Sequence, residues 1–211
     1  MLPFPILQML QQQGLQDIMD KKTRKEFTQA ILIFVTAIIF FLLLGLWSYY
    51  RVEPAFKANT EKEFIDSVNK CVDHLERNIP YDQRINRQLI VTKAALESNY
   101  GRSRFAIEGN NLFGIRQFYN LETGMLPDRV KVNVNWRVAK FNSKCDSVKY
   151  YINLLNTNHH YEEFRKERKF QIDNHLNLPT RYFIRLEKYA TNPLYAELLM
   201  KTYNNIYVIK S

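Results

Sequence analysis

The chain has 211 residues, 46% of them hydrophobic, and it carries 30 Lys and Arg against 21 Asp and Glu, a formal charge of +9. This length allows one modest domain together with a membrane segment. The positive charge favours a polyanionic partner, such as nucleic acid, anionic lipid or an anionic cell wall. We expect no nucleic acid, because the sequence has no zinc-finger spacing, RNP-type aromatic motif or basic helix with heptads. It also lacks a Cys/His cluster and a phosphate-binding loop, so neither a metal nor a cofactor is expected.

An uncharged apolar run, residues 27–50, dominates the N-terminal part of the sequence. At 1.5 Å per residue it is long enough to cross a bilayer as a helix. Basic residues cluster before the run and are sparser after it: Lys21, Lys22, Arg24 and Lys25 against Arg51 and Lys57. The positive-inside rule then predicts a single-pass inner-membrane anchor, with residues 1–26 in the cytoplasm and the rest on the extracytoplasmic side. A cleaved signal peptide fits less well, since the run is too long and no A-x-A site follows.

Residues 51–60 are interpreted as a polar linker, and residues 61–211 as one mainly helical domain. Helical spacing of apolar residues predicts a helix over residues 61–79 and a second over residues 86–98. Thr60 and Glu63 would begin the first helix with a capping box, and Pro80 would end it. Other helices are expected at residues 103–108, 143–156, 161–168, 182–189 and 194–203. The turn-rich GNNLFGIRQF, residues 109–118, and the period-two alternation in VKVNVNWRVAKF, residues 130–141, together predict a small β-hairpin inserted near the middle.

The candidate catalytic residue lies in one stretch, residues 94–118, which reads AALESNYGRSRFAIEGNNLFGIRQF. Its Glu97 falls at the end of a largely apolar helix. Apolar surroundings raise the pKa of a carboxylic acid and let it donate a proton near neutral pH. A lone Glu near a helix end is ordinarily just exposed, so the functional interpretation depends on the surrounding pattern.

That pattern is ALES, then G-x-S-x-[FY]-A, then GNNLFGI, carried here by Ala95–Ser98, Gly101, Ser103, Phe105, Ala106 and Gly109–Ile115. It resembles the Bax-like bacterial glucosaminidases of glycoside hydrolase family 73, in the mannosyl-glycoprotein endo-β-N-acetylglucosaminidase-like superfamily. The resemblance continues, in the family's order, through residues 141–165 and residues 189–206.

The resemblance implies a lysozyme-like helical fold and an endo-β-N-acetylglucosaminidase that cuts the glycan strands of peptidoglycan. It places the catalytic acid on Glu97, and it places Tyr189 beside that acid, although Tyr189 also fits a plain core aromatic. The residues implied to shape the floor of the sugar groove are Asn110, Asn111, Leu112 and Phe113.

The sequence departs from the family at the second acid, because the aligned strand VNVNWRVAKF contains no carboxylate. The nearest candidates are Glu122 and Asp128 in the preceding loop, where carboxylates are usually just solvated. A second carboxylate is not strictly required, since the N-acetyl group of the substrate can act as the nucleophile, with Tyr189 helping to stabilise charge. Trp136 is a candidate for stacking on sugar, or alternatively for packing within the hairpin.

Cys71 and Cys145 both fall on apolar helix faces and are either two buried thiols or, in an oxidising compartment, a disulfide. Two other interpretations of the whole chain stay open at this point. One is a non-catalytic wall-binding or assembly module with a degenerate glucosaminidase fold, and the other is a phage-encoded lysis protein.

Overall fold

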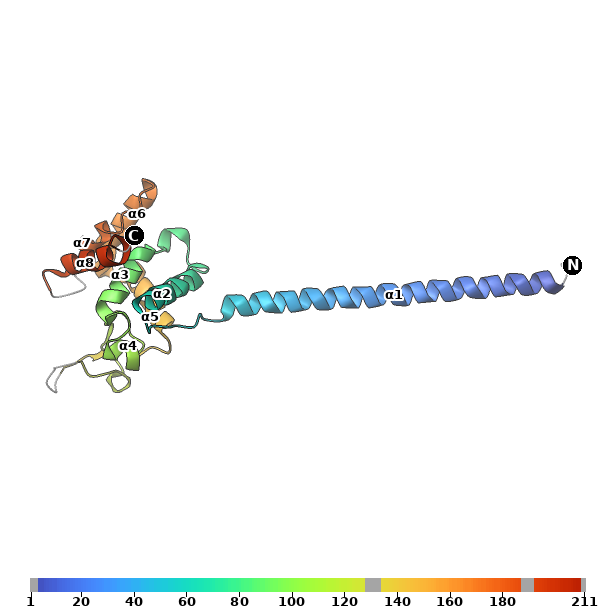
Figure 1. Ribbon diagram of the computed structural model, residues 1–211, viewed down its shortest axis with the longest axis horizontal. Coiled ribbons are helices and arrows are strands. Elements are labelled where there is room, and N and C mark those ends of the chain that lie inside the picture. Colours follow the sequence, from blue (N-terminus) through green and yellow to red (C-terminus); the bar gives the residue numbers. More distant parts are fainter. Residues whose placement is uncertain (1–3, 128–133, 187–191, 210–211) are drawn as a thin grey trace. The chain divides into compact units, whose positions relative to one another are not determined.

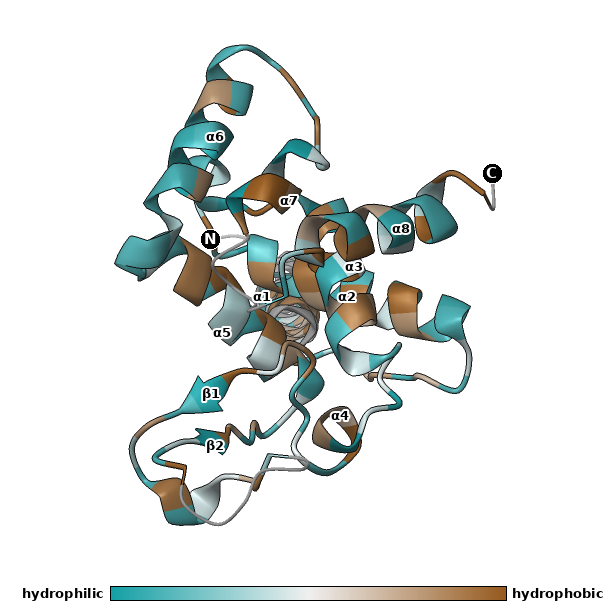
Figure 2. Cartoon of the chain, turned by 90° about the vertical axis from the view of Figure 1, so that its left-hand side faces the viewer, coloured by the Kyte–Doolittle hydropathy of each residue, from teal (hydrophilic) through white to brown (hydrophobic). Residues whose placement is uncertain are grey.

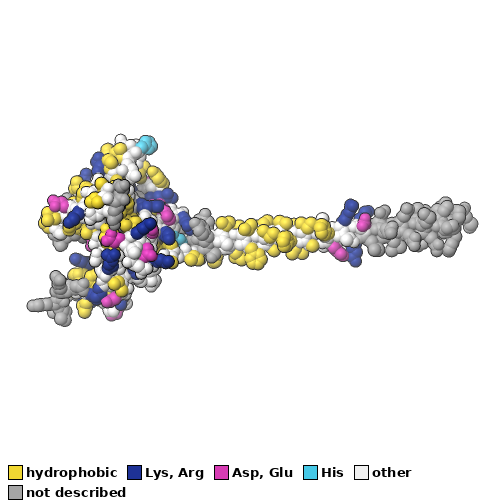
Figure 3. All heavy atoms as spheres, in the orientation of Figure 1, with side chains coloured by type: hydrophobic (Ala, Val, Ile, Leu, Met, Phe, Trp, Pro, Cys, Tyr) yellow, Lys and Arg dark blue, Asp and Glu magenta, His cyan; other side chains and the backbone are white. Residues whose placement is uncertain are grey.

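The computed structural model describes residues 4–127, 134–186 and 192–209, in two compact units, Met1–Val52 and Glu53–Ser211. The first unit is one helix, α1 (Phe4–Arg51), so the expected N-terminal segment and apolar run are continuous. Its part Asp20–Trp47, 28 residues, is long and apolar enough to span a membrane. Hydrophobic side chains cover this part, with Lys and Arg at its N-terminal end (Figure 3).

The second unit is mainly helical. Its α-helices are α2 (Glu61–Glu76), α3 (Arg87–Ser98), α4 (Arg104–Glu108), α5 (Lys144–Thr157), α6 (Glu162–Asp173), α7 (Arg181–Arg185) and α8 (Tyr195–Tyr207). Short 3₁₀ helices are η1 (Tyr81–Gln83), η2 (Leu121–Thr123) and η3 (His159–Tyr161). Strands β1 (Arg116–Gln117) and β2 (Arg137–Val138) pair antiparallel, with Arg116 opposite Val138. The hairpin and α4 lie at one end of the unit and α6 at the other (Figure 1 and Figure 2). This confirms the predicted mainly helical class with a small inserted hairpin.

Local sequence signals begin the main helices as expected. Thr60 and Glu63 form the predicted capping box of α2. The side chains of Asn86 and Ser143 cap α3 and α5 by accepting a backbone N–H three residues on. These caps satisfy amides that would otherwise lack an intrahelical acceptor.

The core forms around α3, which packs between α2 and α8, while α2 also packs on α5. The helices alternate between hydrophobic and polar stretches, as amphipathic helices around one core should (Figure 2). Fully buried apolar side chains come from all of these helices: Phe64, Val68, Val72, Leu89, Ile90, Val91, Ala94, Val148, Leu155 and Leu199. A disulfide between Cys71 and Cys145 joins α2 to α5, with the two Cα atoms 5.3 Å apart.

The chain packs onto the domain before α2 begins, within the segment interpreted above as a linker. The ring of Phe56 meets the ring of Phe64 edge to face, with centroids 5.8 Å apart. The backbone N–H of Lys57 donates to Oγ of Ser67, which in turn donates to the Lys57 carbonyl, both at 2.9 Å. The ordered contacts of the domain therefore include residues 56 and 57.

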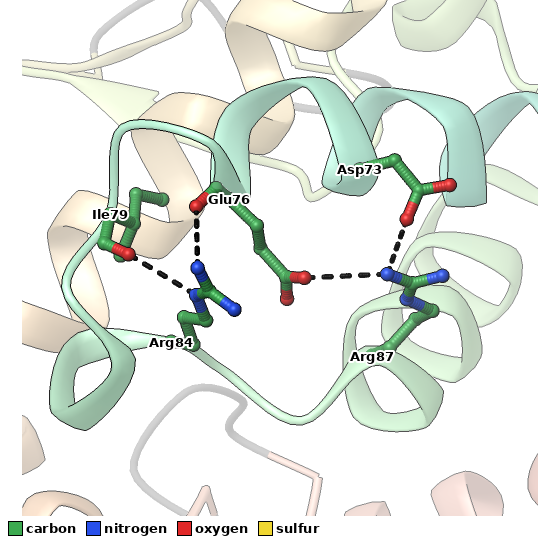
Figure 4. A network of polar contacts seen from close by, with 5 residues as sticks. All are labelled: Asp73, Glu76, Ile79, Arg84 and Arg87. Atoms are coloured by element: carbon green, nitrogen blue, oxygen red, sulfur yellow. Dashed lines mark hydrogen bonds and ion pairs between the residues drawn. The ribbon is translucent and has the colours of Figure 1, made fainter.

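Two arginines fix the connection between α2 and α3 (Figure 4). Arg84 donates to the backbone carbonyls of Ile79 and Glu76, at 3.1 and 3.0 Å. Arg87 pairs with the carboxylates of Asp73 and Glu76. These contacts hold the N-terminal end of α3, the helix that carries Glu97 near its other end.

Candidate active site

Glu97 lies in the last turn of α3, immediately before a sharp reversal of the chain. Asn99, Tyr100 and Gly101 all have left-handed backbone angles, with φ of 49°, 54° and 79°. At Gly101 a Cβ atom would lie 2.9 Å from the ring of Phe64, so only glycine fits this close approach. The reversal ends α3 and leaves Glu97 at its terminus, as the sequence predicted.

Two buried donors hold one oxygen of the Glu97 carboxylate. Nζ of Lys93, one helical turn earlier, lies 2.9 Å from Oε1 of Glu97, and the Tyr195 hydroxyl of α8 donates to the same oxygen at 2.6 Å. The Lys93 ammonium also sits 4.3 Å from the centroid of the Tyr195 ring, a cation–π contact. The apolar surroundings expected for Glu97 are therefore only part of its environment, because α3 and α8 also bring an ammonium and a phenol to it.

The other carboxylate oxygen faces a glycine in the loop that follows α4. A Cβ atom built on Gly114 would lie 3.7 Å from Oε2 of Glu97, and Gly114 is exposed with a φ of +63°. The Glu97 side chain keeps 23% of its surface exposed, whereas Lys93 beside it has none. One oxygen of the carboxylate is thus fixed from the protein side, and the other lies next to an exposed stretch of backbone without a side chain.

Asn111 shapes this loop from within. Its side-chain amide donates to the carbonyls of Ile115 and Ala139, and its oxygen accepts from the N–H groups of Phe113 and Ile115. All four bonds are between 2.9 and 3.2 Å, and Asn111 is only 1% exposed. A buried amide with every group paired holds one loop conformation, because any other conformation leaves polar atoms unsatisfied.

The neighbouring predicted groove residues also lie beneath the loop surface. Leu112 and Phe113 are fully buried, and the Phe113 ring stacks on the Tyr151 ring of α5 with centroids 4.3 Å apart. Asn110, which is partly exposed, donates to the carbonyl of Phe141 at 3.0 Å. Leu112 and Phe113 thus lie inside the domain, whereas Gly114 of the same loop is exposed beside Oε2 of Glu97.

The sequence of the chain matches a known protein family over the region that forms this site. A family model described as mannosyl-glycoprotein endo-beta-N-acetylglucosaminidase, the glucosaminidase family, matches residues 77–208. The chain belongs to this family. The matched region contains α3 with Glu97, the Asn111 loop and α8 with Tyr195, so the residues that meet in space all lie inside the glucosaminidase domain.

Two known proteins are similar to this glucosaminidase, one in sequence and one in fold. Protein bax of Escherichia coli (strain K12) is 35% identical over 98 residues, which cover 44% of this chain and 34% of that protein. The match thus spans about a third of that relative's length. The crystal structure of the catalytic domain of the autolysin Auto from Listeria monocytogenes superposes with a TM-score of 0.50 at 23% identity, covering 73% of this chain and 88% of that one. The second likeness concerns the fold alone, and it confirms the expected lysozyme-like helical domain.

Burial changes the ionisation of the groups around Glu97 in the glucosaminidase domain. Desolvation lowers the pKa of Lys93 to about 7, although the charge and hydrogen bond of Glu97 act in the opposite direction. Desolvation, with smaller contributions from Tyr161 and Glu97, raises the pKa of Tyr151 well above its ordinary value. Lys93 is therefore the group of this cluster whose charge changes near neutral pH.

Of the remaining predicted site residues, Trp136 and Glu122 lie in the described part of the chain, and neither forms a hydrogen bond or ion pair with Glu97 there. Trp136 is half-buried, and the Arg116 guanidinium lies 4.2 Å from its ring centroid, so one face of the ring is already covered within the hairpin. Glu122 is exposed on η2. Asp128 and Tyr189 lie outside the described residues.

Lys93 and Tyr195 are the site residues that the sequence analysis missed. Lys93 precedes Glu97 by four residues, the spacing that puts two side chains on one helix face, so its signal was present in the sequence. Tyr195 lies in the C-terminal segment that carries the family resemblance, in which Tyr189 was the predicted site residue. Across the described residues, no three His, Cys, Asp or Glu side chains gather in a group that would hold a metal ion.

Proposed function

We propose that this glucosaminidase is a peptidoglycan hydrolase, an endo-β-N-acetylglucosaminidase that cleaves glycan strands with Glu97 as the general acid. The observation that carries the proposal is the partly exposed Glu97 carboxylate, whose Oε1 is held by two donors and whose Oε2 lies beside the exposed Gly114. A glycosidase needs such a group to protonate the oxygen of the leaving sugar. The likeness to an autolysin catalytic domain and the name of the family support glycan as the substrate.

The second catalytic group in this proposal is the N-acetyl group of the substrate. It attacks the anomeric carbon while Glu97 protonates the departing oxygen, and Glu97 then accepts a proton from the water that opens the intermediate. Tyr189 is proposed to stabilise the positive charge that develops on the sugar. Glu122 and Asp128 are the competing candidates for a protein nucleophile or base.

The proposal also places the domain outside the cytoplasm, anchored by α1. The 28-residue segment Asp20–Trp47 exceeds the length needed to cross about 30 Å of hydrocarbon. Basic residues at its N-terminal end favour a cytoplasmic N-terminus, and a disulfide in the domain suits an oxidising compartment. An anchored enzyme would act on the wall layer nearest the membrane.

The full chain in detergent micelles is expected to release reducing ends from purified peptidoglycan and to lower its turbidity. Mass spectrometry of the digested muropeptides should find N-acetylglucosamine at the new reducing ends, which reports the bond as well as the activity. A folded chain that binds peptidoglycan without cutting it would instead indicate a wall-binding or assembly module. Genome neighbourhood would distinguish a phage-encoded lysis protein from a cellular hydrolase.

Protease added to spheroplasts is expected to remove the domain, residues 53–211, while a tag placed before Met1 stays protected. The physical reason is the charge difference across α1, which resists transfer of its basic N-terminal flank. Immunoblotting of the two ends measures the outcome. Protection of the domain together with digestion of the tag would mean an inverted topology, and the wall substrate would then be out of reach.

A further inference from the structure

Lys93 is an unusual neighbour for a proposed acid. It lies in the middle of α3 with no exposed side-chain surface, yet its ammonium ends 2.9 Å from Glu97 and 4.3 Å from the centre of the Tyr195 ring. Lysine is almost never fully buried unless it is paired, because an ammonium loses its hydration there. An apolar side chain would fill the same space in the core. Packing alone therefore does not explain why this position holds a lysine.

The proton balance of the pair shows what this charge can do. Lys93 and Glu97 together hold one proton at intermediate pH, either as ammonium and carboxylate or as neutral amine and carboxylic acid. General acid catalysis needs the second arrangement, in which the proton is on Glu97. A charged ammonium in contact with Oε1 favours the first arrangement.

We propose that Lys93 is a positioning residue that orients Glu97 through Oε1 and restrains it as a carboxylate, which limits cutting under acidic conditions. The proposal rests on the proposed function of Glu97 as the acid. It also has a structural consequence that does not depend on hydrolysis, namely that protonation of Glu97 is linked to the charge of Lys93.

The pH range follows from the ionisation of Lys93, whose pKa is lowered to about 7. Above pH 7 the amine is neutral, so it no longer favours the Glu97 carboxylate. Below pH 7 the ammonium lies in contact with Oε1 and opposes protonation of Glu97. A variant without the ammonium loses this opposition, so it should differ from the wild type under acidic conditions and not above pH 8.

The other titratable groups that face the pair are phenols. Tyr195 of α8 donates to Glu97, and the pKa of Tyr151 of α5 is affected by both Glu97 and Tyr161 of η3. The pKa of Tyr161 is raised to about 12 by burial, and phenols ordinarily ionise near pH 10. The side chains that α2 buries are uncharged: Phe64, Ser67, Val68, Cys71 and Val72.

The test compares hydrolysis by the full chain and two variants in detergent between pH 5 and 8. Lys93→Gln keeps an N–H donor for Oε1 but has no charge, and Lys93→Met has neither. We expect the ratio of Lys93→Gln to wild-type kcat to rise from about 1 above pH 8 to at least tenfold at pH 5. Lys93→Met should show the same trend with a lower kcat at every pH, because Oε1 loses a donor.

A matched control is Lys166→Gln on α6, which removes the same charge from an exposed site. Its ratio to the wild type should not vary with pH, so any effect of net charge on wall binding is excluded. A ratio for Lys93→Gln that is also independent of pH would overturn the proposal and leave Lys93 a merely structural residue.

A second readout needs no activity. The ¹³C shift of the Glu97 carboxyl carbon, identified by its loss in Glu97→Gln, should titrate at higher pH in Lys93→Gln than in the wild type. Identical titrations in the two proteins would refute the restraint. If both proteins are folded and hydrolyse nothing, the proposed function fails, whereas the shifts still decide whether Lys93 controls the protonation of Glu97.

Discussion

Glu97→Gln is expected to lower kcat on peptidoglycan by about 10²- to 10⁴-fold, the usual contribution of a positioned general acid. Glutamine keeps the size of the side chain and an oxygen that accepts from Lys93 and Tyr195, so the packing between α3 and α8 should persist. What it loses is the transferable proton on the oxygen that faces Gly114. The loss should therefore appear in kcat, with little change in the amount of protein that sediments with insoluble peptidoglycan.

Four further variants show which group acts with Glu97. Asp128→Asn and Glu122→Gln each remove a candidate second acid, and if only one of them matches the loss at Glu97, that residue holds the role. If neither does and Tyr189→Phe is damaging, the substrate's own N-acetyl group is the nucleophile. Tyr195→Phe removes a donor to Oε1 and should weaken activity less than Glu97→Gln. Full activity of Glu97→Gln would show that the assignment of the acid is wrong.

Most of the fold could be predicted because its signals are local. The capping box of Thr60 and Glu63 and the caps of the later helices each depend on a few neighbouring residues, although α2 ends at Glu76, before the predicted stop at Pro80. Helical spacing of apolar residues then shows which face is buried. Those signals do not depend on partners far along the chain, so the sequence alone was sufficient for them.

The presence of the hairpin was predicted correctly, but the extent of its strands and the packing of the linker were not specified by the sequence. The hairpin was predicted from residues 109–118 and 130–141, and its described strands are Arg116–Gln117 and Arg137–Val138, with a further bridge between Met125 and Val138. Strand length depends on which partner is available, and period-two alternation does not report it. The packing of Phe56 on Phe64 was hidden because an aromatic residue in a polar segment does not reveal which surface will cover it.

The site shows the same division between local and distant information. Glu97 could be placed at a helix end because the family motif and the helix stop are contiguous. Its partner Tyr195 lies 98 residues later and reaches it only through the packing of α8 on α3, which no local pattern specifies. Lys93 was not predicted as a site residue because lysine is rarely buried, so it was not counted among the residues on the buried face of α3. Exceptions of this kind are more common at functional sites, where a local rule is broken for chemistry.

Reduction of the Cys71–Cys145 disulfide is expected to lower the free energy of unfolding by about 4 kcal/mol. The two residues are 74 positions apart, and the chain-entropy relation gives about this value for a closed loop of such length. For a domain of this size the melting temperature should fall by roughly 10 °C. Both cysteines are almost fully buried, so the thiols left after reduction still fill the same space, and the change reports the bond rather than a cavity.

The disulfide also bears on the site, because it ties α2 to α5, and Tyr151 of α5 supports the loop of Phe113 and Gly114. Thermal unfolding followed by near-ultraviolet circular dichroism, with and without reductant, measures the effect on the full chain. The double variant Cys71→Ala and Cys145→Ala is the control, since its melting temperature should not respond to reductant. Alkylation of both thiols in untreated protein from the cell, with a melting temperature that reductant leaves unchanged, would show that the bond does not form. The argument from the disulfide for an oxidising compartment would then be lost, and the placement of the domain outside the cytoplasm would depend on α1 and its flanking charges alone.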